Sequence, residues 1–225
     1  MKRLYFDISA TTPIDLEVSE LMNQIQNNIY GNPSSIHREG QAAKTVIEKS
    51  RRQISSALNC NPEEIIFTSS GSESNNMVLK GCLIKGDHFI TSSYEHPAIL
   101  KILPFLEEMG VQISIVKPDN NGIIKVQSIK NEIRSNTKLI SIMWVNNELG
   151  TINNIDEIGQ LSLDNNIKFH TDGVQALGKI PINLEKTKIN FISMSAHKLY
   201  GPKGVGALYV KKGESLKPLI HGGSQ

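Results

Sequence analysis

Short apolar runs recur along the chain and predict the strands of a sheet. They lie at residues 65–68, 88–91, 111–116, 139–145, 168–171, 191–193 and 205–210. Most of them are apolar on consecutive residues rather than on alternate ones, which is typical of strands that are covered on both faces.

Helical periodicity fills many of the gaps between these runs. Three sets of apolar side chains each share one helical face: Leu16, Leu21, Met22 and Ile25; Ala43, Val46, Ile47, Ile54 and Leu58; Ile99, Leu100, Leu103 and Leu106. Alternating strands and helices predict an α/β fold with a mostly parallel sheet wrapped by helices. Ligands of such folds bind beyond the carboxyl ends of the strands, so we expect the chemistry in the loops that follow them.

Composition excludes several classes of function. The 225 residues carry 24 Lys plus Arg against 22 Asp plus Glu, a formal charge of +2, which disfavours a nucleic-acid binder or a polybasic membrane binder. No apolar run approaches the roughly 20 residues of a membrane span, and the first residues lack the features of a secretory signal. We therefore expect a cytoplasmic protein. Cys60 and Cys82 lack metal-ligand spacing and are interpreted as reduced, structural thiols, with no metal site.

A small-residue loop follows the first predicted strand. The sequence TSSGSES at residues 68–74 leads into helix-like sequence from Asn75 onward. Small residues at a helix start let backbone N–H groups approach an anion, so Gly71 and Ser72 form a candidate phosphate cradle. The alternative is a plain capping box, in which Ser70 or Ser72 pairs with a nearby acid.

Two more predicted strands are followed by polar side chains. His96 precedes Pro97, which holds it in extended backbone at a strand-to-helix corner facing the site. Asn147 follows the 139–145 run and is a candidate ligand contact. The alternatives are a helix cap or surface role for His96, and a turn in which Asn146 and Asn147 satisfy the backbone.

Asp172 and Lys198 follow successive predicted strands, and together they suggest a specific chemistry for these loops. Asp172 lies in HTDGVQ with Gln175, and a buried carboxylate requires a cationic partner. Lys198 lies in SMSAHKLYGPKG, where it could act as a base or an imine-forming amine. The alternatives are a structural ion pair and a solvated lysine. Together they suit an acid that keeps a pyridine nitrogen protonated and an amine that binds an aldehyde cofactor.

Eight sequence blocks, in order, resemble the cysteine desulfurase family of NifS/IscS type, within the class V aminotransferase group of pyridoxal-phosphate enzymes. The blocks are DISATTP at 7–13, YGNPSSIH at 30–37, FTSSGSESNN at 67–76, YEHPA at 94–98, NNELG at 146–150, HTDGVQ at 170–175, SAHKLYGPKG at 195–204 and HGGSQ at 221–225. Ile8 departs from the usual Asn of the family, and Ser224 from a frequent third Gly.

The resemblance assigns roles to individual residues. It implies that Lys198 holds pyridoxal phosphate covalently and carries protons, that Asp172 pairs with the ring nitrogen, and that His96 stacks on the ring and assists catalysis. By the same resemblance Gln175 and Asn147 lie near the phenolic oxygen. The remaining residues, Gly71, Ser72, Ser195 and His197, would gather around the phosphate.

The resemblance also implies a domain organisation. Residues 1–15 would be the N-terminal segment of the fold, and 16–225 the cofactor-binding large domain of fold type I, incomplete at its C-terminal end. The small domain, a carboxylate-binding arginine and the persulfide-forming cysteine of the family have no counterpart in this sequence. Neither Cys60 nor Cys82 is expected to replace that thiol, and we expect little sulfide release from these 225 residues alone.

The implied activity converts L-cysteine to L-alanine and leaves an enzyme persulfide, for iron–sulfur cluster assembly or thiolation. A homodimer is implied, with sulfur-acceptor or scaffold proteins as partners. Three alternatives remain open: another class V enzyme such as a selenocysteine lyase or an aminotransferase, a non-catalytic truncated scaffold, or one half of a split enzyme.

Overall fold

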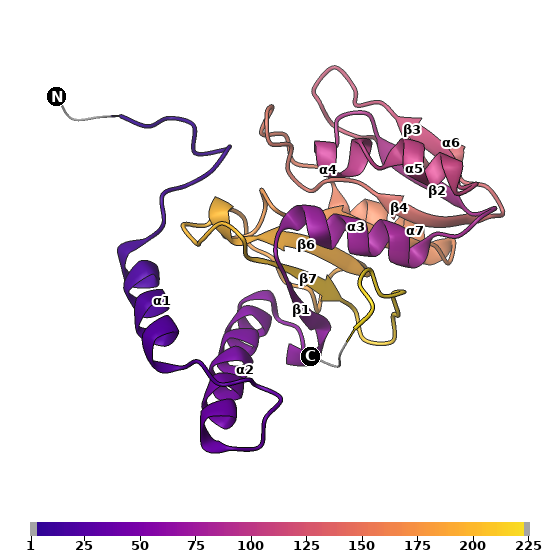
Figure 1. Cartoon of the computed structure of the whole chain (residues 1–225). Coiled ribbons are helices and arrows are strands. Elements are labelled where there is room, and N and C mark those ends of the chain that lie inside the picture. Colours follow the sequence, from indigo (N-terminus) through magenta and orange to yellow (C-terminus); the bar gives the residue numbers. More distant parts are fainter. Residues whose placement is uncertain (1–3, 223–225) are drawn as a thin grey trace.

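A seven-stranded sheet forms the centre of the molecule (Figure 1). The computed structural model describes residues 4–222. The strands are β1 (Ile65–Thr68), β2 (His88–Ser92), β3 (Gln112–Val116), β4 (Thr137–Ser141), β5 (Lys168–Asp172), β6 (Phe191–Ser195) and β7 (Gly206–Val210). They are ordered β1-β7-β6-β5-β4-β2-β3.

The sheet is mostly parallel, which confirms the predicted fold class. Strands β3, β2, β4, β5 and β6 pair in parallel, whereas β7 is antiparallel to both β6 and β1. A short connection joins β6 to β7, and a short connection can only return the chain antiparallel. The carboxyl ends of β1, β2, β4, β5 and β6 therefore meet at one edge of the sheet.

The strand predicted at 139–145 is too long. β4 ends at Ser141, and the chain continues as irregular backbone in which Trp144 N–H donates to the carbonyl of Asp172 over 3.0 Å. Ile142, Met143 and Trp144 are nevertheless buried. Their apolar character reflects burial at the end of the sheet, beyond the last residue of β4.

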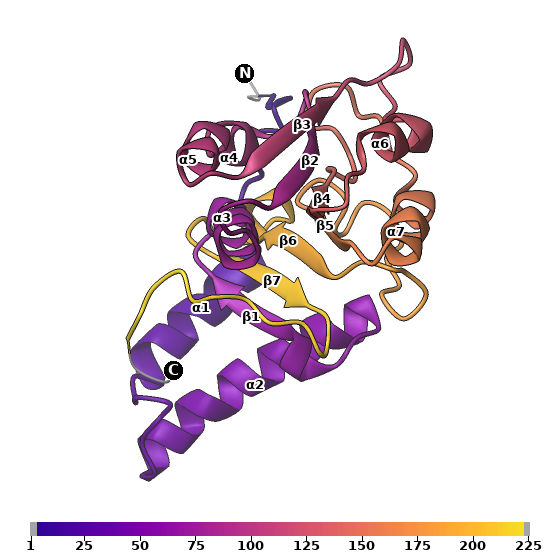
Figure 2. The same cartoon turned by 90° about the vertical axis from the view of Figure 1, so that its right-hand side faces the viewer.

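Seven α-helices surround the sheet in the described part of the chain. They are α1 (Leu16–Asn28), α2 (Arg38–Leu58), α3 (Gly71–Cys82), α4 (Pro97–Leu100), α5 (Leu103–Glu108), α6 (Val126–Glu132) and α7 (Ile155–Asp164). Figure 2 shows α3, α4 and α5 along one face of the sheet, with α6 and α7 along the other. No helix within residues 4–222 is long and apolar enough to cross a membrane.

Two helical predictions need correction. The face predicted from Ile99 to Leu106 belongs to two short helices, because Pro104 in the first turn of α5 has no backbone N–H to donate to the carbonyl of Leu100. The apolar face of α1 forms as a helix, but no residue of α1 is buried, and the side chain of Leu16 remains 72% exposed.

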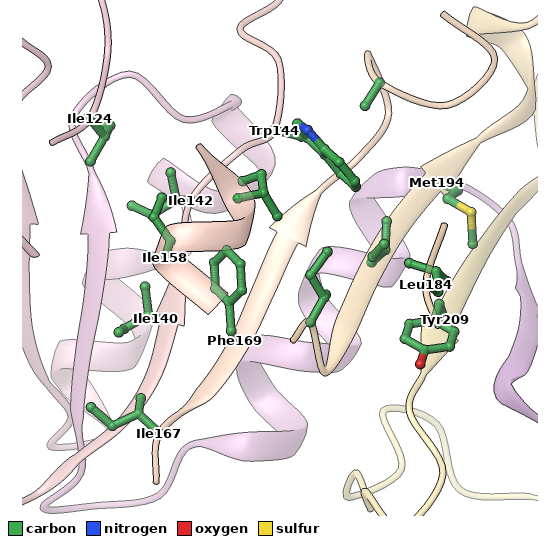
Figure 3. Close-up of a cluster of buried hydrophobic side chains, with 14 of the residues drawn as sticks. Ile124, Ile140, Ile142, Trp144, Ile158, Ile167, Phe169, Leu184, Met194 and Tyr209 are labelled. Atoms are coloured by element: carbon green, nitrogen blue, oxygen red, sulfur yellow. The ribbon is translucent and has the colours of Figure 1, made fainter. Parts of the chain in front are cut away.

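The core lies on both faces of the sheet, as the unbroken apolar runs predict. Ile140 and Ile192 belong to the cluster drawn in part in Figure 3, whereas their chain neighbours Leu139 and Phe191 belong to the cluster on the opposite face. Successive side chains of a strand point to opposite faces, so both must be apolar when helices cover both. This packing fixes the strand ends that carry the site.

Candidate functional site

A cavity of about 560 Å³ opens at the edge of the sheet where the parallel strands end. It is lined by all nine residues predicted from the sequence: Gly71, Ser72, His96, Asn147, Asp172, Gln175, Ser195, His197 and Lys198. The structure thus brings together side chains that follow β1, β2, β4, β5 and β6. Their chemical roles remain predictions.

Asp172 is the last residue of β5, and its carboxylate is buried. Its Oδ2 accepts a hydrogen bond from Asn75 Nδ2 at 2.8 Å, and its Oδ1 accepts one from the N–H of Val174 at 3.0 Å. No ion pair within residues 4–222 involves Asp172, so the expected cationic side-chain partner is absent from the part described. Burial raises the pKa of Asp172, while the hydrogen bond from Asn75 opposes that rise.

Lys198 ends a short 3₁₀ helix, Ala196–Lys198, directly after β6. Its Nζ donates to the carbonyl oxygens of Ser9 and Ala10, each at 2.6 Å. Burial and the nearby charge of Lys179 lower the pKa of Lys198, whereas Asp7 and Asp172 act in the opposite direction. A lysine with a lowered pKa has more of the neutral amine that reacts with an aldehyde.

The start of α3 lines the cavity. α3 begins at Gly71, four residues before the predicted start at Asn75, because the Ser70 side chain accepts a hydrogen bond from the N–H of Glu73 and caps the helix. A Cβ at Gly71 would meet Val174 Cγ2 at 2.8 Å. The helix-cap alternative is thus correct for Ser70. Gly71 and Ser72 line the cavity, and they belong to the first turn of α3, whose backbone N–H groups have no partner within the helix.

His96 and Asn147 both line the cavity, and His96 also caps a helix. His96 caps α4, since its Nδ1 accepts from the N–H of Ala98 at 3.1 Å. Asn146 holds the following turn by accepting from the N–H groups of Glu148 and Leu149. The backbone explanation thus applies to Asn146, whereas Asn147 lines the cavity.

Sequence reasoning missed the N-terminal segment as a wall of the site. Asp7, Ser9 and Ala10 line the cavity, and the carbonyl of Ser9 also accepts from Gln175 Nε2 at 2.8 Å. His197 Nδ1 is 3.0 Å from Thr11 Oγ1. Only the DISATTP block at 7–13 signalled this segment, because its composition carries no recognisable chemistry.

The remaining residues of the wall were also not predicted. They are Ser70, Asn75, Met143, Glu148 and Val174. Asn75 could have been found, because it stands four residues after Gly71 and so lies one helical turn further along α3.

Cys60 and Cys82 do not line the cavity. Burial raises the pKa of Cys60 to about 11 and that of Cys82 to about 12, so neither is a thiolate near neutral pH. Their positions agree with the structural role expected for them.

Pyridoxal phosphate, the cofactor that the resemblance implies, fits this set of groups. The glycine cradle and the start of α3 suit a phosphate, the amine of Lys198 suits the aldehyde, and the buried carboxylate of Asp172 suits a protonated ring nitrogen. The buried Oδ1 of Asn75 has no hydrogen-bond partner among the described residues, which leaves an unused acceptor beside the cavity.

Known proteins share both the sequence and the fold. A cysteine desulfurase IscS from Dictyoglomus turgidum is 48% identical over 230 residues, which cover 100% of this chain and 58% of the relative. A cysteine desulfurase IscS from Methanosarcina thermophila is 45% identical, with coverage of 100% and 56%. The chain thus spans a little over half the length of these relatives.

Two solved structures match closely. One, described as SspA in complex with cysteine, superposes with a TM-score of 0.95 at 42% identity and covers 99% of this chain and 66% of that chain. A NifS-like protein superposes with a TM-score of 0.96 at 39% identity, covering 100% and 63%. The family described as aminotransferase class V matches residues 4–225. This chain belongs to the class V aminotransferase family.

Proposed function

We propose that this chain is the cofactor-binding part of a pyridoxal-phosphate-dependent cysteine desulfurase. One observation carries the proposal: the buried carboxylate of Asp172, which forms no ion pair with the described residues, shares a cavity with the Lys198 amine and with the glycine cradle of α3. The similarity to two proteins named cysteine desulfurase supports the choice of reaction. The solved relative described as a complex with cysteine supports L-cysteine as the substrate.

Asp172 and Lys198 have different roles in the proposed reaction. When bound, pyridoxal phosphate supplies an electron sink for the bond that breaks at the substrate's Cα. Asp172 holds positive charge at the ring nitrogen, because its carboxylate is buried and hydrogen bonded by Asn75 and Val174. Lys198 removes the Cα proton and returns a proton to Cβ, for which a lowered pKa keeps the amine available as a base.

The sulfur transfer needs a thiol in addition to this cavity. A thiol and L-cysteine give a persulfide and L-alanine: the Cβ–S bond breaks, an S–S bond forms, and Cβ gains a proton. Cys60 and Cys82 lie outside the cavity with raised pKa values. We therefore place the accepting thiol outside these 225 residues.

We also propose, from the family resemblance, a domain division and a cellular role. Residues 1–15 would be the N-terminal segment and 16–225 part of the large domain. The whole protein would act as a cytoplasmic homodimer that passes sulfur to partners in iron–sulfur cluster assembly or thiolation. The exposed apolar side chains Leu16, Leu21 and Met22 on α1 support a further protein surface covering this helix.

Exchange of the substrate's α-proton tests the proposal without the missing thiol. The protein is incubated with pyridoxal phosphate and L-alanine or L-cysteine in deuterated water, and loss of the α-proton signal is followed by NMR. We expect exchange that is abolished in Lys198→Ala and in Asp172→Asn, the latter with folding nearly intact, because an amide cannot hold the ring charge.

The products made with dithiothreitol as the sulfur acceptor separate the reaction types. Alanine and sulfide from L-cysteine support a desulfurase. Pyruvate formed from alanine together with pyridoxamine phosphate would instead indicate an aminotransferase. Exchange that is unchanged in Lys198→Ala would refute the proposed site.

A further inference from the structure

Lys179 lies outside the cavity, yet it contacts one of the cavity's walls. Its Nζ donates a hydrogen bond to Oε1 of Gln175, which lines the cavity. The chain leaves β5 through successive turns, in which the N–H of Lys179 donates to the carbonyl of Ala176 at 3.0 Å. Lys179 stands four residues after Gln175 in sequence. The turns bring the two side chains to the same side of this segment.

The neighbouring glycine brings this segment against the residue that follows Lys198. Gly178 has a φ of +71°, and a Cβ there would meet Leu199 Cδ2 at 2.6 Å. A side chain at position 178 would therefore push the two segments apart, and its positive φ would also be strained. Lys179 and Lys198 thus belong to adjoining segments that pack directly on each other.

An ammonium group fixes which way round the Gln175 amide lies. Lys has three donors and no acceptor, so it can contact only the oxygen of a carboxamide. With Oε1 held by Lys179, Nε2 points the other way and donates to the carbonyl of Ser9 at 2.8 Å. Its second N–H remains available to an acceptor in the cavity.

The Ser9 carbonyl links this arrangement to Lys198, whose Nζ donates to the same oxygen at 2.6 Å. The polar contacts therefore run from Lys179 through Gln175 and Ser9 to Lys198. The charged groups that act on the Lys198 amine are Lys179, Asp7 and Asp172. Lys179 is the cation among them, and like charge disfavours the ammonium form of Lys198.

We propose that Lys179 is a positioning residue of the site, which orients the Gln175 amide and, through Gln175 and the Ser9 carbonyl, helps to set the surroundings of the Lys198 amine. The inference deepens the proposed function and rests on it in treating Lys198 as the reacting amine. Lys179 is itself exposed, so its substitution should leave the core intact.

The test measures the reactivity of Lys198 in the protein without added cofactor. The protein is labelled with trace isotopic acetic anhydride across a range of pH, and mass spectrometry of the Lys198 peptide gives the pKa and the nucleophilicity of this amine. In Lys179→Met we expect the pKa of Lys198 to rise by about half a unit, which lowers labelling below that pKa about threefold. Lys179→Arg keeps the charge and the donor, and should retain the wild-type value.

The inference would be overturned if the pKa of Lys198 in Lys179→Met equalled that of the wild type. An equal rise of this pKa in Lys179→Met and Lys179→Arg would also overturn it. Reductive trapping of pyridoxal phosphate on the wild-type protein separates this inference from the proposed function. A shifted pKa without trapping at Lys198 supports the role of Lys179 while the cofactor proposal fails. Trapping with no shift in Lys179→Met overturns the role of Lys179 alone.

Discussion

Asn75 donates a hydrogen bond to Asp172 over 2.8 Å, and both side chains are buried. The anion that the proposed cofactor needs is thus held by a neutral amide from α3 and a backbone N–H, and it forms no ion pair within residues 4–222. A neutral donor stabilises the carboxylate but leaves its charge available to a ligand. The arrangement keeps Asp172 ready for a cationic partner in the cavity.

Asn75→Ala should therefore destabilise the protein in a pH-dependent way. Loss of the donor leaves the ionised carboxylate less satisfied, at a cost of about 1–3 kcal/mol. Burial already raises the pKa of Asp172, and removal of the Asn75 donor should raise this pKa further. The stability lost in the variant, relative to the wild type, should therefore grow as the pH rises and Asp172 ionises. Urea denaturation from about pH 4 to pH 9 measures the difference.

Asn76→Ala is the matched control, because Asn76 on the same helix is only partly buried and donates only to the carbonyl of Ser72. Its effect should stay within about 0.5 kcal/mol at every pH. An Asn75→Ala loss that is the same at both ends of the pH range would contradict the proposed link to Asp172.

Because of Glu95, the free energy of unfolding should fall as the pH rises. Its carboxyl is fully buried, accepts from Ser92 Oγ and from the N–H of Met143, and has a pKa raised to about 8 by burial. The unfolded carboxyl loses its proton near 4.5, whereas the folded one keeps it up to about 8. Between these values the unfolded state binds fewer protons, so stability falls by up to about 1.4 kcal/mol per pH unit.

Glu95→Gln removes that titration while keeping the shape and an acceptor for Met143. Its stability should depend less steeply on pH between about 4.5 and 8 than that of the wild type, as measured by urea denaturation. Parallel pH profiles for the two proteins would show that Glu95 is not the titrating group.

Gly71→Ala should weaken binding of the cofactor's phosphate. The new Cβ would meet Val174 Cγ2 at 2.8 Å, so the cradle must shift. We expect affinity for pyridoxal phosphate to fall about tenfold, roughly 1.4 kcal/mol, with little change for pyridoxal, which lacks the phosphate. Equal losses for the two ligands in a fluorescence titration would argue against a phosphate cradle at Gly71.

Neither cysteine should react readily or matter for proton exchange. Because burial raises their pKa values to about 11 and 12, alkylation of Cys60 and Cys82 by iodoacetamide at neutral pH should be much slower than that of a free thiol. Cys60→Ser and Cys82→Ser should each keep wild-type α-proton exchange. Loss of exchange in either serine variant would mean that the thiol contributes to the site.

Local signals predicted most of the fold and the polar residues of the cavity. Apolar runs covered on both faces marked the strands, and parallel strands bring their carboxyl ends to one edge whatever their order. For this reason the sequence alone places Asp172 and Lys198, which follow neighbouring strands, at the same edge of the sheet. The start of α3 was misplaced because Ser70 caps the helix, and a small-residue loop can equally well be the first helical turn.

Long-range contacts could not be predicted in this way. The carbonyls of Ser9 and Ala10 meet Lys198 across nearly the whole chain, and a backbone carbonyl has no sequence signature. The periodicity of α1 predicts a helix but does not specify what covers it. A cation was expected beside Asp172 because burial of a lone charge is costly, yet hydrogen bonds from Asn75 and Val174 meet part of that cost.

The central claim is that Lys198 is the amine that binds pyridoxal phosphate in this cavity. The protein is saturated with pyridoxal phosphate, reduced with borohydride, digested and analysed by mass spectrometry. We predict one dominant phosphopyridoxyl modification, on Lys198, which disappears in Lys198→Ala without moving to Lys179 or Lys203. A modification spread over surface lysines, or one that persists at the same level in Lys198→Ala, would contradict the account.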